Sequence, residues 1–586
     1  MKNITLINSY NEMVKKNNFS NGLFSLATIL KRDGYNVQII DFDYLITIGK
    51  VRNSGDFKKD TTEMLKYIIE TNPDIVGFYT MCSSYYLTLE IAKELKNFDC
   101  NIKVMLGGPQ ATMTAVETLQ TYNWIDVIGL GEGEKTITNI VKTLFSNKQF
   151  SNENGIAYVG IDGKVVVNKM DLIENLDELP LIDYSFLEGE IDKAISLDVG
   201  RGCPFSCKYC STKMFWKRRF RLKSTNRIID EMIYHKKIFG IDNFIFQHDL
   251  FTANKKMLIE FCDKVIDLGL KFQWTCSSRV DTLDEESIAK MKKAGCRSIF
   301  LGIESGSEKI QKVINKNLKI DKVYEVVRLL KKYNIIVRAS FMYGFPEETL
   351  EDIELTLKLI FDLRMMQVED TQLHLFTVLP GTEYYNQLKE RLIFTNKLSD
   401  SSFTKYINTN IEKSILNNTA IFSQYFDFST QTRTESEYLD IYVYSISKTL
   451  MKYMSTTYRM LYSIFGSHYK VFRNLKIANM EKFEMLSRDK NHLRIDPNSE
   501  IECVENLIND IDYSEYKDRL VQVFAFERDI IEFMYFSKKP KVEKSYEYDV
   551  YDYKKNTNSL ETISLNQIHV LFTRIDGNKI NIKKIS

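Results

Sequence analysis

Three cysteines in one short segment have a spacing suited to an iron–sulfur cluster. Cys203, Cys207 and Cys210 lie in Arg201-Gly-Cys-Pro-Phe-Ser-Cys-Lys-Tyr-Cys210, which gives the pattern C-x3-C-x2-C. Three thiolates at this spacing can bind three irons of a [4Fe-4S] cubane and leave the fourth iron without a protein ligand. An iron with an open position is available for chemistry. We therefore expect a redox-active cluster at these three residues.

Two other uses of the cysteines fit the sequence less well. A structural zinc site would need a fourth Cys or His at regular spacing, and none follows within the next few turns. Disulfides are not expected either, because nine cysteines among 586 residues is ordinary for a cytosolic protein and the number is odd. Cys503 is isolated in sequence, so we expect no second cluster.

The cysteine segment follows an apolar run, residues 195–199, and precedes a regular alternation of helix and strand patterns. Helical periodicity is found at about 225–240, 254–268, 284–294, 320–333 and 349–364, and apolar β-rich runs at 244–247, 272–276, 298–303, 335–342 and 371–378. A complete eight-fold barrel needs about 250 residues, so the shorter stretch here predicts a partial TIM-type (β/α)6 barrel. Sites in such barrels lie at the carboxyl ends of the strands, which is where the cysteine segment begins.

With these motifs, residues 190–390 resemble the radical S-adenosylmethionine (SAM) superfamily. The resemblance implies that the open iron binds the amino and carboxylate groups of SAM. It also implies that an electron from the cluster cleaves SAM to a 5′-deoxyadenosyl radical, while the protein binds and orients the cofactors and excludes water.

The resemblance also implies SAM contacts. Tyr209 matches an aromatic residue that lies near the adenine, and Glu304 matches an acid that receives the ribose hydroxyls. Gln247 and Asp249 flank His248 in place of the family's Gly-Gly-Glu-like stretch, so the chain departs from the family pattern there. The remaining implied contacts are polar residues of the third and fifth strands: Ser278, Arg279, Arg338 and Ser340. Taken singly, each could equally serve as a strand-end or capping residue.

The first 150 residues predict a separate doubly wound parallel sheet. Short apolar runs at 4–8, 37–40, 75–79, 104–106 and 127–128 alternate with helical patterns. Two glycine-containing turns follow the last two runs, Gly107-Gly-Pro109 and Gly129-Leu-Gly-Glu-Gly-Glu134. Glycine lets the backbone approach a bulky ligand closely, and ligands of such sheets bind over the strand carboxyl ends.

A doubly wound domain with these turns, placed ahead of a cysteine-triplet barrel, is similar to the cobalamin-binding radical SAM enzymes of the class B methyltransferase type. The resemblance implies a Rossmann-like cobalamin domain. The implied contacts are Thr80, Ser83, Gly107, Gly108, Pro109, Gly129, Gly131, Glu132 and Gly133. Phe19, in Asn17-Asn-Phe-Ser-Asn-Gly22, takes the place of the usual cobalt-binding histidine, so we expect no histidine ligand from this domain.

The rest of the chain provides connections and a less distinctive C-terminal region. Residues 151–189 contain a predicted hairpin that turns at Asp162-Gly163, followed by a linker. Residues 215–224 are basic and aromatic, and we expect them to cover SAM and contact an anionic group rather than nucleic acid. Residues 391–586 are mainly helical in pattern, with strand-like patches near the end. We expect an auxiliary region that closes the barrel and helps to define the substrate. The four predicted domains are therefore 1–150, 151–189, 190–390 and 391–586.

Composition narrows the partners. The formal net charge is +1, which argues against a polyanionic nucleic-acid partner. No apolar run reaches about 18 residues and the chain begins directly with a strand pattern, so we expect neither a membrane span nor a signal peptide. A low-potential cluster needs reducing surroundings, which predicts a cytoplasmic enzyme served by a flavodoxin-like or ferredoxin-like electron donor.

Together these features predict a cobalamin-dependent radical SAM methyltransferase that acts on an unactivated carbon, or on phosphorus, of a natural product or peptide. No residue is assigned as proton donor or acceptor. Two alternatives remain open: a cyclase or ring-rearranging enzyme with the same cofactors, and a non-catalytic binding or regulatory module. A methylthiolating enzyme is disfavoured because cysteines for an additional cluster are missing.

Overall fold

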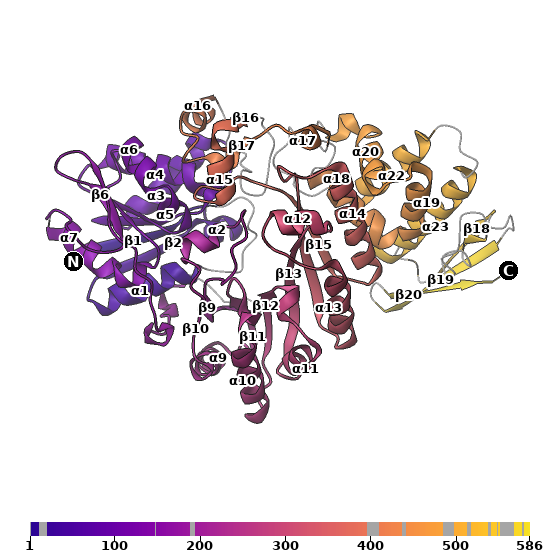
Figure 1. Ribbon diagram of the computed structural model, residues 1–586, viewed down its shortest axis with the longest axis horizontal. Coiled ribbons are helices and arrows are strands. Elements are labelled where there is room, and N and C mark those ends of the chain that lie inside the picture. The colour runs from indigo at the N-terminus through magenta and orange to yellow at the C-terminus, as the bar shows by residue number, and fades with distance from the viewer. Residues whose placement is uncertain are drawn as a thin grey trace. The chain divides into compact units, whose positions relative to one another are not determined.

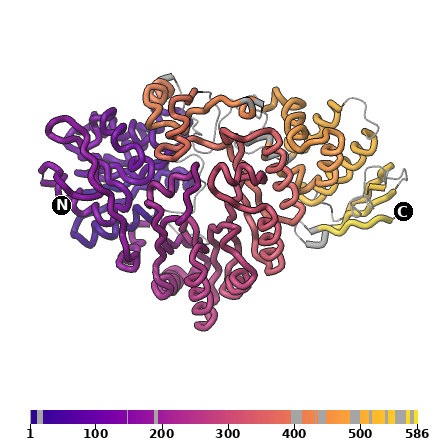
Figure 2. The backbone as a smooth tube through the Cα atoms, in the orientation of Figure 1, coloured from indigo at the N-terminus to yellow at the C-terminus, as the bar shows by residue number. Residues whose placement is uncertain are grey.

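The computed structural model describes most of the chain (Figure 1 and Figure 2). The described residues are 2–10, 20–146, 148–187, 194–394, 409–435, 441–483, 497–511, 517–536, 539, 541–547, 549–550, 568–576 and 579–585. The chain divides into two compact units. Residues 1–304, 308–340 and 374–429 form the first unit, and residues 305–307, 341–373 and 430–586 form the second. The stretch around Phe19 lies outside the described residues.

The first unit begins with a doubly wound sheet. Five parallel strands in the order β2-β1-β3-β4-β5 are joined by helices, as predicted. The strands are β1 (Asn3–Asn8), β2 (Asn36–Asp41), β3 (Ile75–Tyr79), β4 (Lys103–Gly107) and β5 (Val127–Gly129). The helices are α1 (Asn21–Arg32), α2 (Phe42–Thr47), α3 (Phe57–Glu70), α4 (Tyr85–Phe98), α5 (Pro109–Met113), α6 (Ala115–Thr121) and α7 (Ile137–Ser146).

Two apolar cores cover the two faces of this sheet. Ile4, Leu6 and Met105 pack with residues of α1 and α7 on one face. Ile7, Phe78, Leu106 and other buried residues pack with α3, α4 and α6 on the opposite face. Successive strand residues point to opposite faces, so the two clusters follow from burial on both sides. This two-sided burial explains why the strands read as continuous apolar runs.

The predicted hairpin extends the same sheet. Strands β6 (Ile156–Val159) and β7 (Val165–Val167) are antiparallel, and β6 pairs with β5 through Gly129 and Ile156. The sequence predicted the hairpin but not its place at the sheet edge. This pairing brings the following residues, up to Met170, back beside residues 129–134, which we call the β5 turn.

The second sheet has the strand order β15-β14-β13-β12-β11-β8, as expected for six barrel strands. The pairs β8/β11, β11/β12 and β12/β13 are parallel. The strands are β8 (Ile195–Asp198), β11 (Asn243–Gln247), β12 (Gln273–Ser278), β13 (Cys296–Glu304), β14 (Ile336–Tyr343) and β15 (Asp370–Leu375). The helices are α8 (Thr212–Phe215), α9 (Thr225–Phe239), α10 (Lys255–Asp267), α11 (Glu285–Lys293), α12 (Glu308–Val313), α13 (Ile320–Lys332) and α14 (Leu350–Met365). The predicted fold class is confirmed.

One later segment of the first unit packs on the first sheet. It contains α15 (Glu383–Leu388), β16 (Ile393–Phe394), α16 (Thr409–Asn417) and β17 (Phe426–Asp427). Ile415 and Phe422 join the core formed with α4 and α6. The side chain of Gln110 donates a hydrogen bond to the Ile421 carbonyl at 2.7 Å. This part of the C-terminal region therefore closes over the N-terminal sheet.

The second unit continues with helices and a small terminal sheet. Its remaining elements are α17 (Gln431–Glu435), α18 (Ile441–Tyr453), α19 (Ser455–Phe465), α20 (His468–Ile477), α22 (Pro497–Asn509), α23 (Lys517–Tyr535), β18 (Lys541–Tyr546), β19 (Ile568–Asp576) and β20 (Lys579–Lys584). The three strands are antiparallel and are traced in yellow in Figure 2. Among the described residues, no helix is both long and apolar enough to cross a bilayer.

Candidate functional site

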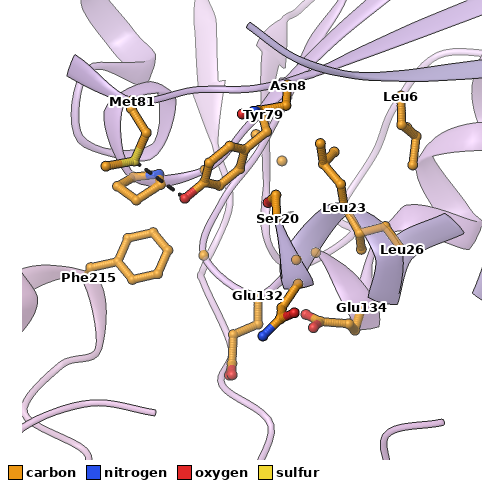
Figure 3. A pocket seen from close by; sticks show the side chains of 18 of the residues that line it. Leu6, Asn8, Ser20, Leu23, Leu26, Tyr79, Met81, Glu132, Glu134 and Phe215 are labelled. Atoms are coloured by element: carbon orange, nitrogen blue, oxygen red, sulfur yellow. Dashed lines mark hydrogen bonds between the residues drawn. The ribbon is translucent and has the colours of Figure 1, made fainter. Parts of the chain in front are cut away.

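A cavity of about 920 Å³ lies at the carboxyl ends of the first sheet (Figure 3). Asn8, Tyr79 and Gly107 border it from β1, β3 and β4, and Ser20 and Leu23 border it at the start of α1. Part of its wall comes from residues around the cysteine segment and the next barrel strand ends: Asp198, Gly200, Arg201, Phe215, Trp216, Gln247, His248, Asp249 and Ser277. One cavity thus borders both predicted cofactor regions of the first unit.

The two glycine turns line this cavity, and their contacts with cobalamin stay a prediction. Gly107, Gly108, Pro109, Gly129, Gly131, Glu132 and Gly133 all line it. Gly108 has φ +99°, and a Cβ there would lie 2.9 Å from the Thr80 carbonyl oxygen. At Gly131, with φ +70°, a Cβ would collide with the Met170 side chain. Both positions therefore require glycine.

Thr80 and Ser83 do not border the cavity. Thr80 is buried, and its Oγ1 donates to the Gly107 carbonyl at 2.8 Å and accepts from the Ala111 N–H at 3.0 Å. It therefore holds the glycine turn in place. The neighbouring side chains of Tyr79 and Met81 do border the cavity, and the Tyr79 hydroxyl donates to Met81 Sδ at 3.3 Å (Figure 3).

Ion pairs cross from the glycine turn to the residues that flank the cysteine segment. Arg201 Nη1 lies 2.7 Å from Glu132 Oε1, and Arg201 Nη2 lies 2.6 Å from Glu134 Oε1 and 3.0 Å from Asp198 Oδ2. Arg221 Nη1 lies 2.7 Å from Glu132 Oε2. Glu132 and Glu134 line the cavity, yet their carboxylates are already bound by arginines.

The cysteine segment leaves a short antiparallel ribbon of β9 (Gly200–Arg201) and β10 (Arg221–Leu222). Gly202 has φ +88°, and a Cβ there would collide with the Arg219 carbonyl. The turn by which the chain leaves the ribbon therefore requires glycine at this position. The Asp249 carboxylate accepts from the Gly202 N–H at 3.1 Å. The Lys208 N–H donates to the Ile314 carbonyl at 3.0 Å. These bonds hold the cysteine segment at Gly202 and at Lys208.

The donor set fits an iron–sulfur cluster. Cys203, Cys207 and Cys210 are free thiols, and soft thiolate ligands suit such clusters. Burial raises the pKa of Cys203 to about 11, so bound iron would have to stabilise its thiolate. In the described part of the chain, no three Cys, His, Asp or Glu side chains converge on one metal ion. A cubane does not require such convergence, because each cysteine binds a different iron.

A buried polar cluster lies beside the cysteines, at the end of β13. Glu304 is 7% exposed and has φ +72°. Its Oε1 accepts from Lys316 Nζ at 2.7 Å and from the Tyr209 hydroxyl at 3.1 Å. Burial and the charge of Glu304 raise the pKa of Tyr209, so its hydroxyl stays protonated and donates. The predicted residues Tyr209 and Glu304 therefore meet, together with Lys316.

Arg279 lies against the cysteine segment. Its guanidinium carbon is 3.8 Å from the Phe205 ring centroid, and Nη1 lies 3.8 Å from Cys207 Sγ. Nη2 donates to Asp281 and to the Lys316 carbonyl, both at 2.7 Å. In this arrangement Arg279 contacts a cluster cysteine directly, whereas the sequence suggested only a SAM contact.

The other predicted SAM residues are more dispersed. Ser278 is buried and shares a 2.7 Å hydrogen bond with Thr252. Gln247 Nε2 donates to Ser196 Oγ at 3.3 Å. Arg338 is exposed and Ser340 is half-buried. Their contacts with SAM remain predictions.

Three basic side chains of residues 215–224 form ion pairs within the chain, and the expected contacts of this stretch with SAM and an anionic group stay a prediction. Arg219 Nη2 lies 2.5 Å from Glu174 Oε2 and Lys223 Nζ lies 2.9 Å from Glu231 Oε1, while Arg221 binds Glu132.

Sequence reasoning missed Lys316, and it assigned no role to Arg201. Lys316 is an isolated lysine in a polar stretch, and only the fold brings it to Glu304. Arg201 directly precedes Gly202 and Cys203, which was a usable signal.

Comparison with known families supports both halves of the site. The B12 binding domain model matches residues 11–141, and the radical SAM superfamily model matches residues 197–360. An uncharacterized methyltransferase of Pyrococcus horikoshii is 33% identical over 66% of this chain and 81% of its own length. The chain belongs to the cobalamin-dependent radical SAM family. The predicted family is thus confirmed.

A second relative and one solved structure extend this comparison. The anaerobic magnesium-protoporphyrin IX monomethyl ester cyclase of Rubrivivax gelatinosus is 31% identical over 58% of this chain and 61% of its own length. A solved structure of the cobalamin-dependent radical SAM enzyme OxsB with aqua-cobalamin bound has a TM-score of 0.60 and 18% identity, over 90% of this chain and 84% of that chain. At that identity the structural match establishes the fold.

Proposed function

We propose that this enzyme transfers a methyl group from SAM to an unactivated carbon, or to phosphorus, of a natural product or peptide. The observation that carries the proposal is the single cavity bordered by both glycine turns and by the residues that flank the cysteine segment. A cavity of this size is suited to a large cofactor. The similarity to the methyltransferase of Pyrococcus horikoshii supports methyl transfer.

The residues of the chain divide the work between two cofactor sites. Cys203, Cys207 and Cys210 would hold the cluster, and Tyr209 with Glu304 would hold the SAM nucleoside. The glycine turns would admit the corrin ring. When bound, the cluster and SAM supply a carbon-centred radical and cobalamin supplies methyl transfer. Phe215 and Trp216 would keep water from the cavity.

The proposal includes partners and location. A reduced flavodoxin-like or ferredoxin-like protein would supply electrons, since the cluster requires a low-potential donor. The engagement of Arg219, Arg221 and Lys223 in ion pairs supports a small-molecule or peptide substrate rather than a nucleic acid. We propose a cytoplasmic location without membrane attachment, where thiols remain reduced.

Anaerobic reconstitution tests the proposal. Purified enzyme is loaded with iron, sulfide and hydroxocobalamin and then desalted. It is supplied with SAM that carries a labelled methyl group, a strong reductant, and candidate substrates suggested by the neighbouring genes. We expect bound iron and cobalamin, release of 5′-deoxyadenosine, and S-adenosylhomocysteine in proportion to labelled product. Absence of cobalamin, or of 5′-deoxyadenosine, would contradict it.

A second candidate is a cyclase that uses the same cofactors, which the 31% identical cyclase favours. The same assay separates the two functions. A cyclase would release 5′-deoxyadenosine without S-adenosylhomocysteine and would leave the product unlabelled. A non-catalytic module would release neither compound.

A further inference from the structure

The ion pairs between the β5 turn and the cysteine segment form one buried cluster, which we call the carboxylate–arginine network: Glu132, Glu134, Asp198, Arg201 and Arg221. The two glutamate side chains are at most 7% exposed, and the two arginine side chains at most 10%. All of these residues except Arg221 line the cavity. The network is therefore a continuous part of the cavity wall.

Glu132 has a special place in the network. Arg201 and Arg221 are register partners on the β9/β10 ribbon, which closes the base of the loop carrying the three cysteines. Each Glu132 oxygen binds one of these arginines at 2.7 Å, and Oε2 also accepts from the Ile173 N–H at 2.6 Å. The Glu132 carboxylate thus binds one arginine on each strand of the ribbon.

Glu134 provides a second carboxylate that binds Arg201. Arg201 donates to it from both Nη1, at 3.3 Å, and Nη2, at 2.6 Å, and Ser25 of α1 donates to it at 3.1 Å. Burial by itself would raise the pKa of Glu134, but the charge of Arg201 and the hydrogen bonds to this carboxylate together outweigh burial and hold the pKa below its usual value. A guanidinium fork held on three carboxylates leaves Arg201 little rotational freedom.

A second ion pair of the loop is far more exposed. The neighbouring Arg219–Glu174 ion pair also joins the loop to the linker, but its side chains are 55% and 67% exposed. Exposed pairs contribute little, whereas buried, forked pairs define geometry. This contrast gives a matched control.

We propose that Glu132 and Glu134 are positioning residues, which fix the cluster-bearing loop against the cobalamin cavity and so set the relative placement of the two cofactors. The inference rests on the proposed cofactors. Its effect is mechanical: the carboxylates act through Arg201 and Arg221, two residues ahead of Cys203 and at the far end of the loop. Loosening the network would leave both cofactors bound but would widen the range of distances and orientations between them.

The test uses the full-length enzyme loaded with both cofactors and compares wild type with Glu132→Gln, Glu134→Gln and the control Glu174→Gln. Reduced cluster and Co(II) cobalamin are both paramagnetic, so pulsed electron paramagnetic resonance measures how strongly cobalt accelerates relaxation of the cluster spin. We expect Glu132→Gln to retain wild-type iron and cobalamin content. The acceleration of cluster relaxation by cobalt should fall at least threefold, and the distribution of relaxation rates should broaden. Release of 5′-deoxyadenosine per methylated product should rise about fivefold. Glu174→Gln should match wild type in both measurements.

The outcomes separate this inference from the proposed function. Wild-type enzyme that binds no cobalamin would contradict the proposed function itself. Wild-type relaxation in Glu132→Gln, with both cofactors bound, would overturn only the positioning role. If Glu132→Gln loses a cofactor, two other variants are compared with wild type. Glu134→Gln leaves Glu132 bound to both arginines, and Arg201→Lys keeps the positive charge but removes the guanidinium fork. Each should give a partial loss of enhancement, and unchanged relaxation in both would overturn the inference.

Discussion

At the scale of single residues, Glu304 combines backbone strain with a buried ion pair. A non-glycine residue at φ +72° costs free energy, which the fold must compensate. The compensation comes from Lys316 and Tyr209, both of which bind the same Glu304 oxygen. Such strain is found where a side chain must be held in one direction, which supports a ligand-binding role for this carboxylate.

We predict that Glu304→Gln weakens SAM binding about tenfold, or about 1.4 kcal/mol, because an amide receives ribose hydroxyls less strongly than a carboxylate. Calorimetric titration of cluster-loaded enzyme with SAM measures this change. Glu308→Gln is the control, since Glu308 lies four residues away but pairs with Lys319 at the surface. Equal affinities for wild type and Glu304→Gln would remove Glu304 from the SAM site.

Arg279 leads to a second prediction at this scale. Its charge lies 3.8 Å from Cys207 Sγ and favours the more negative, reduced cluster. Arg279→Gln should therefore lower the reduction potential by about 50 mV, which corresponds to about 1.2 kcal/mol for one electron. A potentiometric titration followed by electron paramagnetic resonance measures the shift. An unchanged potential would show that the guanidinium does not influence the cluster.

At the scale of elements, local patterns were sufficient for most helices and strands. The prediction of a helix at 320–333 corresponds to α13, Ile320–Lys332, because its apolar residues recur at helical spacing. What local patterns could not predict is pairing over long distances. The hairpin's place beside β5 and the packing of α16 on the first sheet depend on surfaces that form only in the folded chain.

The turn after β14 contains a buried acid whose ionisation should affect stability. Glu348 is 3% exposed, its Oε2 accepts from the Gly344 N–H, and its Oε1 has no hydrogen-bond partner among the described residues. Burial raises its pKa to about 8, with Asp352 raising it further and Arg433 opposing the shift. The folded protein therefore keeps this proton at pH values where the unfolded chain has released it.

The sign of the effect follows from linkage. The contribution of Glu348 to stability is complete below pH 4.5 and is lost as the pH rises towards 8, at about 1.4 kcal/mol per pH unit. We predict that Glu348→Gln removes this loss, so its advantage over wild type in thermal unfolding grows from pH 6 to pH 8. The exposed neighbour provides a control, because Glu347→Gln should follow the wild-type profile. A constant difference between Glu348→Gln and wild type would show that Glu348 is already ionised.

At the scale of the whole molecule, the doubly wound sheet has cores of its own on both faces. Gly108 and Gly131 line the cavity, whereas Cys203, Cys207 and Cys210 are not among its lining residues. The sequence could predict both cofactor regions from short motifs. It could not predict the carboxylate–arginine network, because Glu132 meets partners 69 and 89 residues away, and its glycine-rich turn indicated a ligand contact rather than an ion pair.

We predict that the two cofactors load independently. Replacing Cys203, Cys207 and Cys210 by serine should abolish iron binding and leave cobalamin binding at the wild-type level. Gly108→Val should do the reverse, because its side chain would meet the Thr80 backbone where the corrin ring must approach. Iron analysis and the absorption spectrum of cobalamin measure both. Loss of cobalamin together with iron in the cysteine variant would contradict independent loading.

The separation of Glu132 from its arginines also matters while the protein is being made. Translation adds about 5 to 20 residues per second, so Arg201 and Arg221 follow Glu132 out of the ribosome after roughly 3 to 18 s. During that interval the acidic turn is hydrated and its side of the nascent sheet stays open. The half of the cavity wall that contains Arg201 is therefore synthesised only after the half that contains Glu132.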